Sequence, residues 1–109
     1  MLTQYQFYTK VTEACIDMLK KENELRSDMH HIKVHVISTC RNEMHKLRDD
    51  VDTPLHANDL TVDVDITRLS VYGYRIHLKL GICKFSVMIS YNPRAVSFEI
   101  IKNESMPPD

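Results

Sequence analysis

Six histidines stand in this chain of 109 residues, and four of them lie between positions 30 and 45. His31 and His35 are four residues apart, a spacing that places two imidazoles on one side of a helix, and His45 continues that side. Such a pair can share a metal ion, and imidazole also titrates near neutral pH. No cysteine or carboxylate stands where a third ligand is required. A solvated helix face without metal is therefore favoured, and a pH-responsive surface or a metal site are the alternatives.

A second group of candidate residues is basic. Arg75, His77 and Lys79 alternate along one segment, Lys84 follows them, and Arg94 stands between two later apolar runs. A cluster of this kind could contact phosphate, nucleic acid or an acidic protein. Sheets that bind RNA usually interleave aromatic rings with the cations, and no aromatic residue shares the expected face of these side chains. We name all five as candidate binding residues on a face of mixed charge.

No motif in the chain specifies a reaction. The patterns G-x-S-x-G and H-E-x-x-H are absent, and two glycines are too few for a loop that wraps phosphate. Cys15, Cys40 and Cys83 are odd in number and widely spaced, each inside an apolar pattern. They indicate three buried, reduced thiols rather than disulfides or a zinc site. We expect no cofactor, and binding is favoured over catalysis.

The composition is that of an ordinary globular domain. Hydrophobic residues make up 43%, charged residues 27%, and the net charge of −1 gives no overall field to attract nucleic acid or anionic lipid. No apolar run approaches the roughly 18–20 residues of a membrane span, and the first residues show no signal-peptide pattern. We expect a single cytoplasmic domain over residues 1–102 and a flexible C-terminal tail at 103–109.

Two helices are predicted in the first half of the chain. Thr3 and Gln6 form a capping-box pattern that begins a helix over about residues 3–26. Ser27 and Asp28 are N-cap candidates for a second helix over about residues 28–50. Its apolar side chains recur at spacings of three and four: Met29, Ile32, Val36, Cys40, Met44, Leu47 and Val51. Residues 31–36 also alternate in steps of two, so a strand is the rival interpretation there.

From residue 60 onward the apolar period changes to two, which predicts strands over about residues 60–67, 74–80, 83–90 and 95–101. Gly81 and Ile82 suit a two-residue type II′ turn. Simple hairpins then give three inner rows: Val62/Leu78/Phe85/Ile100, Val64/Ile76/Val87/Phe98 and Ile66/Tyr74/Ile89/Val96. On the outer face this register pairs Asp65 with Arg75 and Asp63 with His77, and turns Met88 and Ile101 outward. The predicted fold is α+β, with two N-terminal helices packed on one face of a four-stranded antiparallel β-meander.

The first helix carries apolar residues on more than one side. Tyr5, Ile16 and Leu19 lie off its main apolar stripe. Two apolar sides indicate either a helix deep in the core or a helix that also contacts a partner. A homodimer through this helix is one form of the second alternative.

The hairpin from Gly81 to Ile89, followed by a turn and the run from Val96 to Ile100, resembles the terminal hairpin of RelE-like mRNA interferase toxins. Those toxins are small proteins with a helix pair and a sheet, and they cut ribosome-bound mRNA with basic side chains. The resemblance implies that Lys84 is the basic residue after the hairpin glycine. It also implies that Arg75, His77 and Arg94 steady phosphate charge.

Three functions follow from these features. A small, nearly neutral domain without a reaction motif favours a non-enzymatic protein-binding module of the inhibitor, immunity or adaptor type. Its partner would be another protein. The alternatives are a RelE-like ribosome-dependent mRNA-cleaving toxin and a nucleic-acid-binding domain that uses the basic outer face of the sheet.

Overall fold

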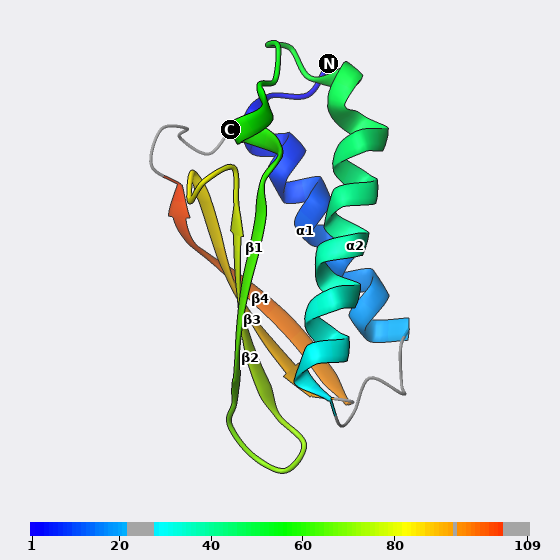
Figure 1. The fold of residues 1–109 in the computed structure, drawn as a ribbon, viewed down its shortest axis with the longest axis vertical. Coiled ribbons are helices and arrows are strands. Elements are labelled where there is room, and N and C mark those ends of the chain that lie inside the picture. Colours follow the sequence, from blue (N-terminus) through cyan, green and yellow to red (C-terminus); the bar gives the residue numbers. More distant parts are fainter. Residues whose placement is uncertain (22–27, 93, 104–109) are drawn as a thin grey trace.

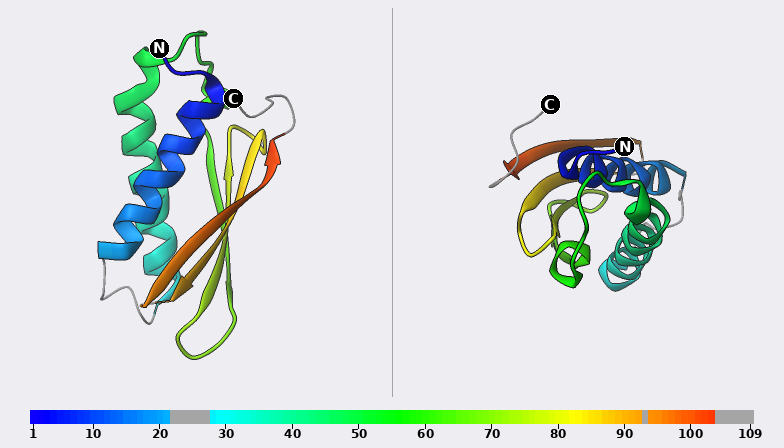
Figure 2. Two further views of the ribbon diagram at one scale, coloured as in Figure 1. Left: turned by 180° about the vertical axis from the view of Figure 1, so that it is seen from behind. Right: turned by 90° about the horizontal axis from the view of Figure 1, so that it is seen from above.

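The computed structural model describes residues 1–21, 28–92 and 94–103, which form two layers (Figure 1). Helices α1 (Gln4–Lys21) and α2 (Met29–Leu47) come first, and the short 3-10 helices η1 (Arg48–Asp50) and η2 (Ala57–Leu60) follow. The antiparallel strands β1 (Val62–Arg68), β2 (Tyr74–Leu80), β3 (Phe85–Asn92) and β4 (Ala95–Asn103) neighbour one another in chain order. Both helices cover the same face of the sheet (Figure 2), so the α+β prediction is confirmed.

Both helices begin at predicted caps. Thr3 Oγ1 accepts a hydrogen bond from the Gln6 N–H at 3.1 Å, and Gln6 Oε1 accepts one from the Thr3 N–H at 3.0 Å. Asp28 Oδ1 accepts from the His30 N–H at 2.9 Å. Helix α2 ends at Leu47, and the last residues predicted as helix form η1 instead. The predicted end of the first helix, with Ser27, and the predicted tail beyond residue 103 lie outside the described residues.

The strand faces agree with the prediction, but the predicted register is wrong by two residues at each hairpin. Leu78 pairs with Val64 and Val87, not with Val62 and Phe85, and Phe98 lies opposite Ile89. Because side chains alternate with a period of two, this shift leaves the residues of the predicted inner rows on the inner face. The observed inner rows are Val62/Leu80/Phe85, Val64/Leu78/Val87/Ile100, Ile66/Ile76/Ile89/Phe98 and Arg68/Tyr74/Tyr91/Val96.

The turn between β2 and β3 accounts for part of the register error. Leu80 pairs with Phe85, so the turn contains residues 81–84 rather than the predicted pair. Gly81, Ile82 and Cys83 all have left-handed backbone conformations, with φ of 63°, 53° and 63°. The third strand therefore begins at Phe85 and not at Cys83 as predicted. Cys83 is consequently exposed, which corrects the prediction of three buried thiols.

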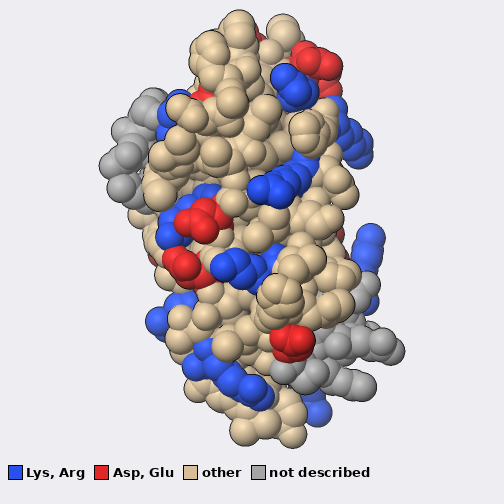
Figure 3. All heavy atoms as spheres, viewed as in Figure 1, with Lys and Arg blue, Asp and Glu red and all other residues tan. Residues whose placement is uncertain are grey.

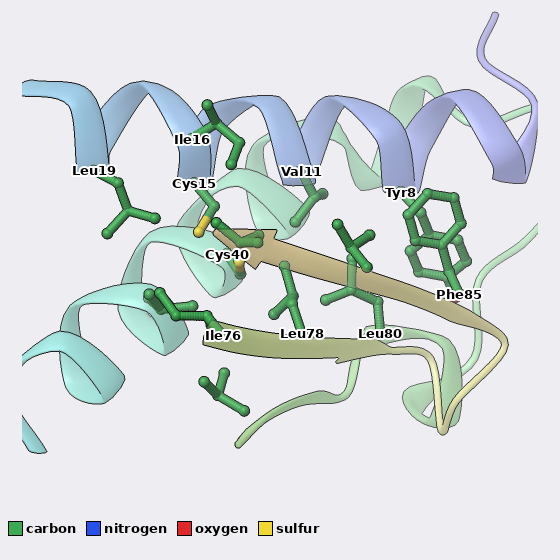
Figure 4. Close-up of a cluster of buried hydrophobic side chains, with 14 of the residues drawn as sticks. Tyr8, Val11, Cys15, Ile16, Leu19, Cys40, Ile76, Leu78, Leu80 and Phe85 are labelled. Carbon is green, nitrogen blue, oxygen red and sulfur yellow. The ribbon is translucent and has the colours of Figure 1, made fainter. Parts of the chain in front are cut away.

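The core fills the space between the helices and the inner face of the sheet (Figure 4). Tyr8 on α1 stacks on Phe85 with ring centroids 5.6 Å apart, and the buried Cys15 and Cys40 face each other across the two helices. Ile16 and Leu19 are only 4% and 2% exposed. Of the three residues that suggested a second contact surface on the first helix, Ile16 and Leu19 are thus buried within the protomer, and Tyr5 is partly buried against the core.

Two further observations concern the periphery of the fold. Phe98 was predicted to lie in the dry interior, but it is 39% exposed because it belongs to the edge strand β4. Ile101 is exposed, as its outward position predicted. Within the described ranges, no helix combines the length and the apolar character needed to cross a bilayer.

Candidate functional site

The five basic candidates do not form one free cationic surface, because two of them are paired with carboxylates. Lys79 Nζ lies 2.7 Å from Asp65 Oδ2 and 3.5 Å from Asp63 Oδ2. Its hydrogen bond lowers the pKa of Asp65, and the same bond raises the pKa of Lys79. The predicted pairs Asp65–Arg75 and Asp63–His77 are wrong, since the true register places Asp63 opposite Lys79 and Asp65 opposite His77.

Lys84 lies in the β2–β3 turn and makes a contact that belongs to the fold. Its Nζ lies 2.6 Å from Oδ1 of Asp59, whose side chain is only 4% exposed. The other carboxylate oxygen of Asp59 accepts from the His56 N–H at 2.9 Å. Burial raises the pKa of Asp59, but the hydrogen bonds from Lys84 and His56 outweigh burial and hold the pKa below its ordinary value. Sequence reasoning missed this pair because its partners lie 25 residues apart.

Further hydrogen bonds, from the Tyr8 hydroxyl and to Thr61, hold the same turn in place. The Tyr8 hydroxyl donates to the Asp59 carbonyl at 2.8 Å. Gly81 N–H donates to the Thr61 carbonyl at 3.0 Å, and the Ile82 N–H donates to the Thr61 hydroxyl at 2.7 Å. Burial raises the pKa of Tyr8, and the nearby charge of Asp59 adds to the effect. These contacts give Lys84 a structural role at this end of the sheet.

Among the described residues, the histidines do not combine with other side chains into a metal site. The rings of His31 and His35 lie 4.4 Å apart on α2, as their spacing predicted. His77 is half-buried between Asp65 and Met88, and its Nε2 atom is buried without a hydrogen-bond partner among the described residues. Among the residues that the structure describes, no three His, Cys, Asp or Glu side chains come together to hold a metal ion.

An open groove of about 760 Å³ runs between the two helices. Charged side chains of both signs line it, namely Lys10, Glu13, Asp17, Glu43, Lys46, Asp49 and Asp50. Five of these side chains are carboxylates and two are lysines, so the groove carries an excess of negative charge. It is a solvated surface between two amphipathic helices.

The β1–β2 hairpin projects beyond the rest of the sheet (Figure 1), and three large apolar residues lie in its loop. Leu69 is 53% exposed, Val71 67% and Tyr72 70%. We call residues 69–72 the apolar tip. In Figure 3 this projecting end is formed by uncharged atoms, and Lys or Arg side chains lie close to it. Three large exposed apolar residues in one short loop are uncommon on a surface without a partner.

Hydrogen bonds order the backbone of the apolar tip although its side chains are exposed. The Leu69 N–H donates to the Gly73 carbonyl at 2.9 Å. Arg68 Nε donates to the Ser70 carbonyl at 3.2 Å, and Arg68 Nη2 donates to the Val71 carbonyl at 3.1 Å. The same guanidinium lies over the Tyr74 ring, 5.6 Å from its centroid. The tip therefore presents its side chains from a preformed loop.

Arg75 and Arg94 lie at the same end of the sheet as the apolar tip. Arg75 follows the first residue of β2, and Arg94 lies in the turn from β3 to β4, beside the Tyr74–Tyr91 pair. Both side chains are exposed, and neither has a carboxylate partner among the described residues. The structure thus separates Arg75 and Arg94 from Lys79 and Lys84. The sequence signal for the tip was its three large apolar residues within a predicted loop, which sequence reasoning did not use.

No family model, no curated protein and no solved structure matches this chain.

Proposed function

We propose that this chain is a small non-enzymatic protein-binding module that contacts its partner with the apolar tip, residues 69–72. The observation that carries this proposal is the combination of exposed apolar side chains and an ordered backbone. Leu69, Val71 and Tyr72 contribute little to the core, whereas burial in a partner would remove their apolar surface from water. A loop that is ordered before binding loses less conformational entropy when the complex forms.

The charges near the tip indicate the chemistry of the partner. Arg75 and Arg94 are exposed at the same end of the sheet and have no carboxylate partner in the described part of the chain. Tyrosine and arginine are enriched at protein interfaces, where apolar anchors occupy pockets and charged residues surround them. A partner with an apolar pocket bordered by carboxylates would complement this arrangement, and the charges would mainly accelerate association.

A site-specific crosslinking experiment tests the proposal. A photoreactive amino acid at position 71 should capture the partner, whose affinity is then measured for purified variants. We expect Val71→Ser or Tyr72→Ser to weaken binding by about tenfold or more, the effect typical of an interface hot spot. Ile82→Ser is the matched control, because Ile82 is 58% exposed in the β2–β3 turn at the opposite end of the sheet. Undiminished affinity in both tip variants would refute the proposed surface.

The two alternative functions predict different observations. A RelE-like mRNA-cleaving toxin would arrest growth on expression, and Arg75→Ala or Lys84→Ala would abolish the arrest. A nucleic-acid-binding domain would be retained on heparin and released by moderate salt. Neither alternative gains support from the contacts of Lys79 and Lys84, since both lysines have carboxylate partners. Because Lys84→Ala also removes the partner of a buried carboxylate, circular dichroism must accompany that variant.

A further inference from the structure

We propose that a second copy of this chain pairs with β4, so that the two sheets continue into one another across a two-fold axis. Strand β4 is an edge of the sheet, and no other described strand lies along its free side. The unpaired N–H and C=O groups of such an edge are a template for a further antiparallel strand. This inference concerns a surface other than the apolar tip and does not depend on the function proposed above.

The two edge strands, β1 and β4, differ in how well they are protected against pairing with a strand of another molecule. The edge strand β1 carries Asp63 and Asp65, which are paired with Lys79, and helix α2 packs beside it. Charged residues on an edge oppose pairing with another strand. Strand β4, by contrast, carries Glu99 as its one acidic residue, and Lys102 follows near its end. Strand β4 is therefore the edge that is open to a second copy.

The inner face of β4 is incompletely covered within one protomer. Helix α1 packs against this strand, yet Phe98 remains 39% exposed. Val96 and Ile100 lie on the same face and are only partly buried against the core. A neighbouring strand would extend the apolar inner rows and shield all three side chains, which supplies a hydrophobic contribution to the pairing.

The sequence of β4 is self-complementary in one register. A two-fold axis perpendicular to the sheet keeps inner residues opposite inner residues. When Phe98 lies opposite Phe98 of the second copy, Val96 lies opposite Ile100 of that copy, and all inner pairs are apolar. On the outer face the same register places Ser97 opposite Glu99, a pair without like charges.

The neighbouring registers are less favourable. Centring the pair on Glu99 would place two carboxylates directly opposite each other, which is destabilising. Centring it on Ser97 would oppose the apolar Ile100 with Arg94 in the β3–β4 turn. The Phe98-centred register avoids both conflicts, so we assign it to the dimer.

Engineered cysteines test the assigned register. In a Cys83→Ser background, which leaves the buried Cys15 and Cys40, Phe98→Cys places two thiols in directly opposed positions. Opposed residues have Cβ atoms about 4.5–5.5 Å apart, near enough for a disulfide with small adjustments. Val96→Cys is the matched control, because its two copies would be offset by four residues, or roughly 13 Å along the strand.

Mild oxidation with diamide should convert Phe98→Cys to a covalent dimer, and Val96→Cys should stay monomeric on non-reducing gels. Equal crosslinking of the two variants, or none in Phe98→Cys, would overturn the assigned pairing. Glu99→Cys reports the competing register: stronger crosslinking at position 99 than at 98 would also overturn the assignment.

Charge substitutions test the dimer in the otherwise native chain by sedimentation equilibrium. Ser97→Glu should oppose Glu99 of the second copy in two symmetric pairs and raise the dimer Kd by about 2- to 30-fold. The double variant Ser97→Glu/Glu99→Lys should restore the affinity, because the opposed pairs become attractive. A wild-type chain that is monomeric at roughly 0.1 mM, or a double variant without recovery, would refute the dimer. Circular dichroism checks that each variant is folded.

Discussion

The close approach of Gly81 to Tyr8 leads to a quantitative test of the β2–β3 turn. Gly81 has a φ of +63°, and a methyl group at this position would overlap the Tyr8 hydroxyl oxygen and lie 2.8 Å from the ring Cζ atom. The hydroxyl that would be displaced donates a hydrogen bond to the Asp59 carbonyl. Gly81→Ala therefore forces both a left-handed alanine and a movement of a buried ring.

The expected cost has three parts. A non-glycine residue in the left-handed conformation costs about 1–2 kcal/mol. Overpacking against a buried side chain adds about 1–3 kcal/mol, and loss of the Tyr8 hydrogen bond about 1 kcal/mol. We expect Gly81→Ala to lower the free energy of unfolding by about 3–6 kcal/mol, a large part of the stability of a typical domain.

A double-mutant cycle separates the overlap from the backbone strain. Tyr8→Phe removes the hydroxyl group and should cost about 1 kcal/mol by itself. In the Tyr8→Phe background the most severe overlap is absent, so Gly81→Ala should cost about 1–2 kcal/mol less than in the wild type. The remaining cost reports the left-handed backbone and the contact with the ring.

Urea denaturation followed by circular dichroism measures all four proteins, since the chain has no tryptophan. Gly73→Ala is the matched control. Gly73 does not have a positive φ, and an added Cβ would meet only the rotatable Ser70 hydroxyl at 2.9 Å. Its cost should stay below about 1 kcal/mol. A Gly81→Ala protein as stable as Gly73→Ala, or a strictly additive cycle, would refute the packing described for this turn.

Three other predictions concern the same region. Asp59→Asn should lower the free energy of unfolding by about 1–3 kcal/mol at pH 7, because it weakens hydrogen bonds to a buried group. Since the folded pKa of Asp59 lies below its ordinary value of 3.8, the wild-type advantage is present above that value and is lost as the pH falls through the folded pKa. If the free energies of unfolding of the wild type and of Asp59→Asn changed in parallel with pH, this prediction would be contradicted. Ile82→Gly should raise the melting temperature, because it relieves a left-handed β-branched residue that is 58% exposed; a lower value would argue against strain. Cys83 should react with Ellman's reagent in the native protein before the two buried thiols, and simultaneous reaction of all three would contradict their burial.

Local patterns predicted the elements and their faces well. The capping box of Thr3 and Gln6, the N-cap residue Asp28 and the spacing of apolar residues located the starts of both helices, because these signals involve residues only two to four positions apart. Alternation along the strands also assigned Val64, Ile76 and Val87 correctly to the buried face. Phe98 was assigned to the correct face, but its exposure depends on how far α1 extends over the edge strand.

The candidate site was less predictable, because it depends on register and turn shape. A register error of two residues left the strand faces unchanged, yet it gave Asp63 and Asp65 different cross-strand partners from those predicted. For the same reason the contacts of Lys79 with Asp63 and Asp65 were not predicted. Exposure of the apolar tip could not be read from periodicity, since a loop has no period to indicate which way its side chains point.

The sequence by itself determined that two amphipathic helices would cover one apolar face of an antiparallel meander, because the periods of helices and strands are local properties of the chain. Only the tertiary structure decided the register, the ion pairs and the exposed ends. The Tyr8 hydroxyl meets the Asp59 carbonyl across 51 residues, and Lys84 meets the Asp59 carboxylate across 25. Such contacts select one turn among several that bury the same residues, so their geometry becomes available only once the layers have packed.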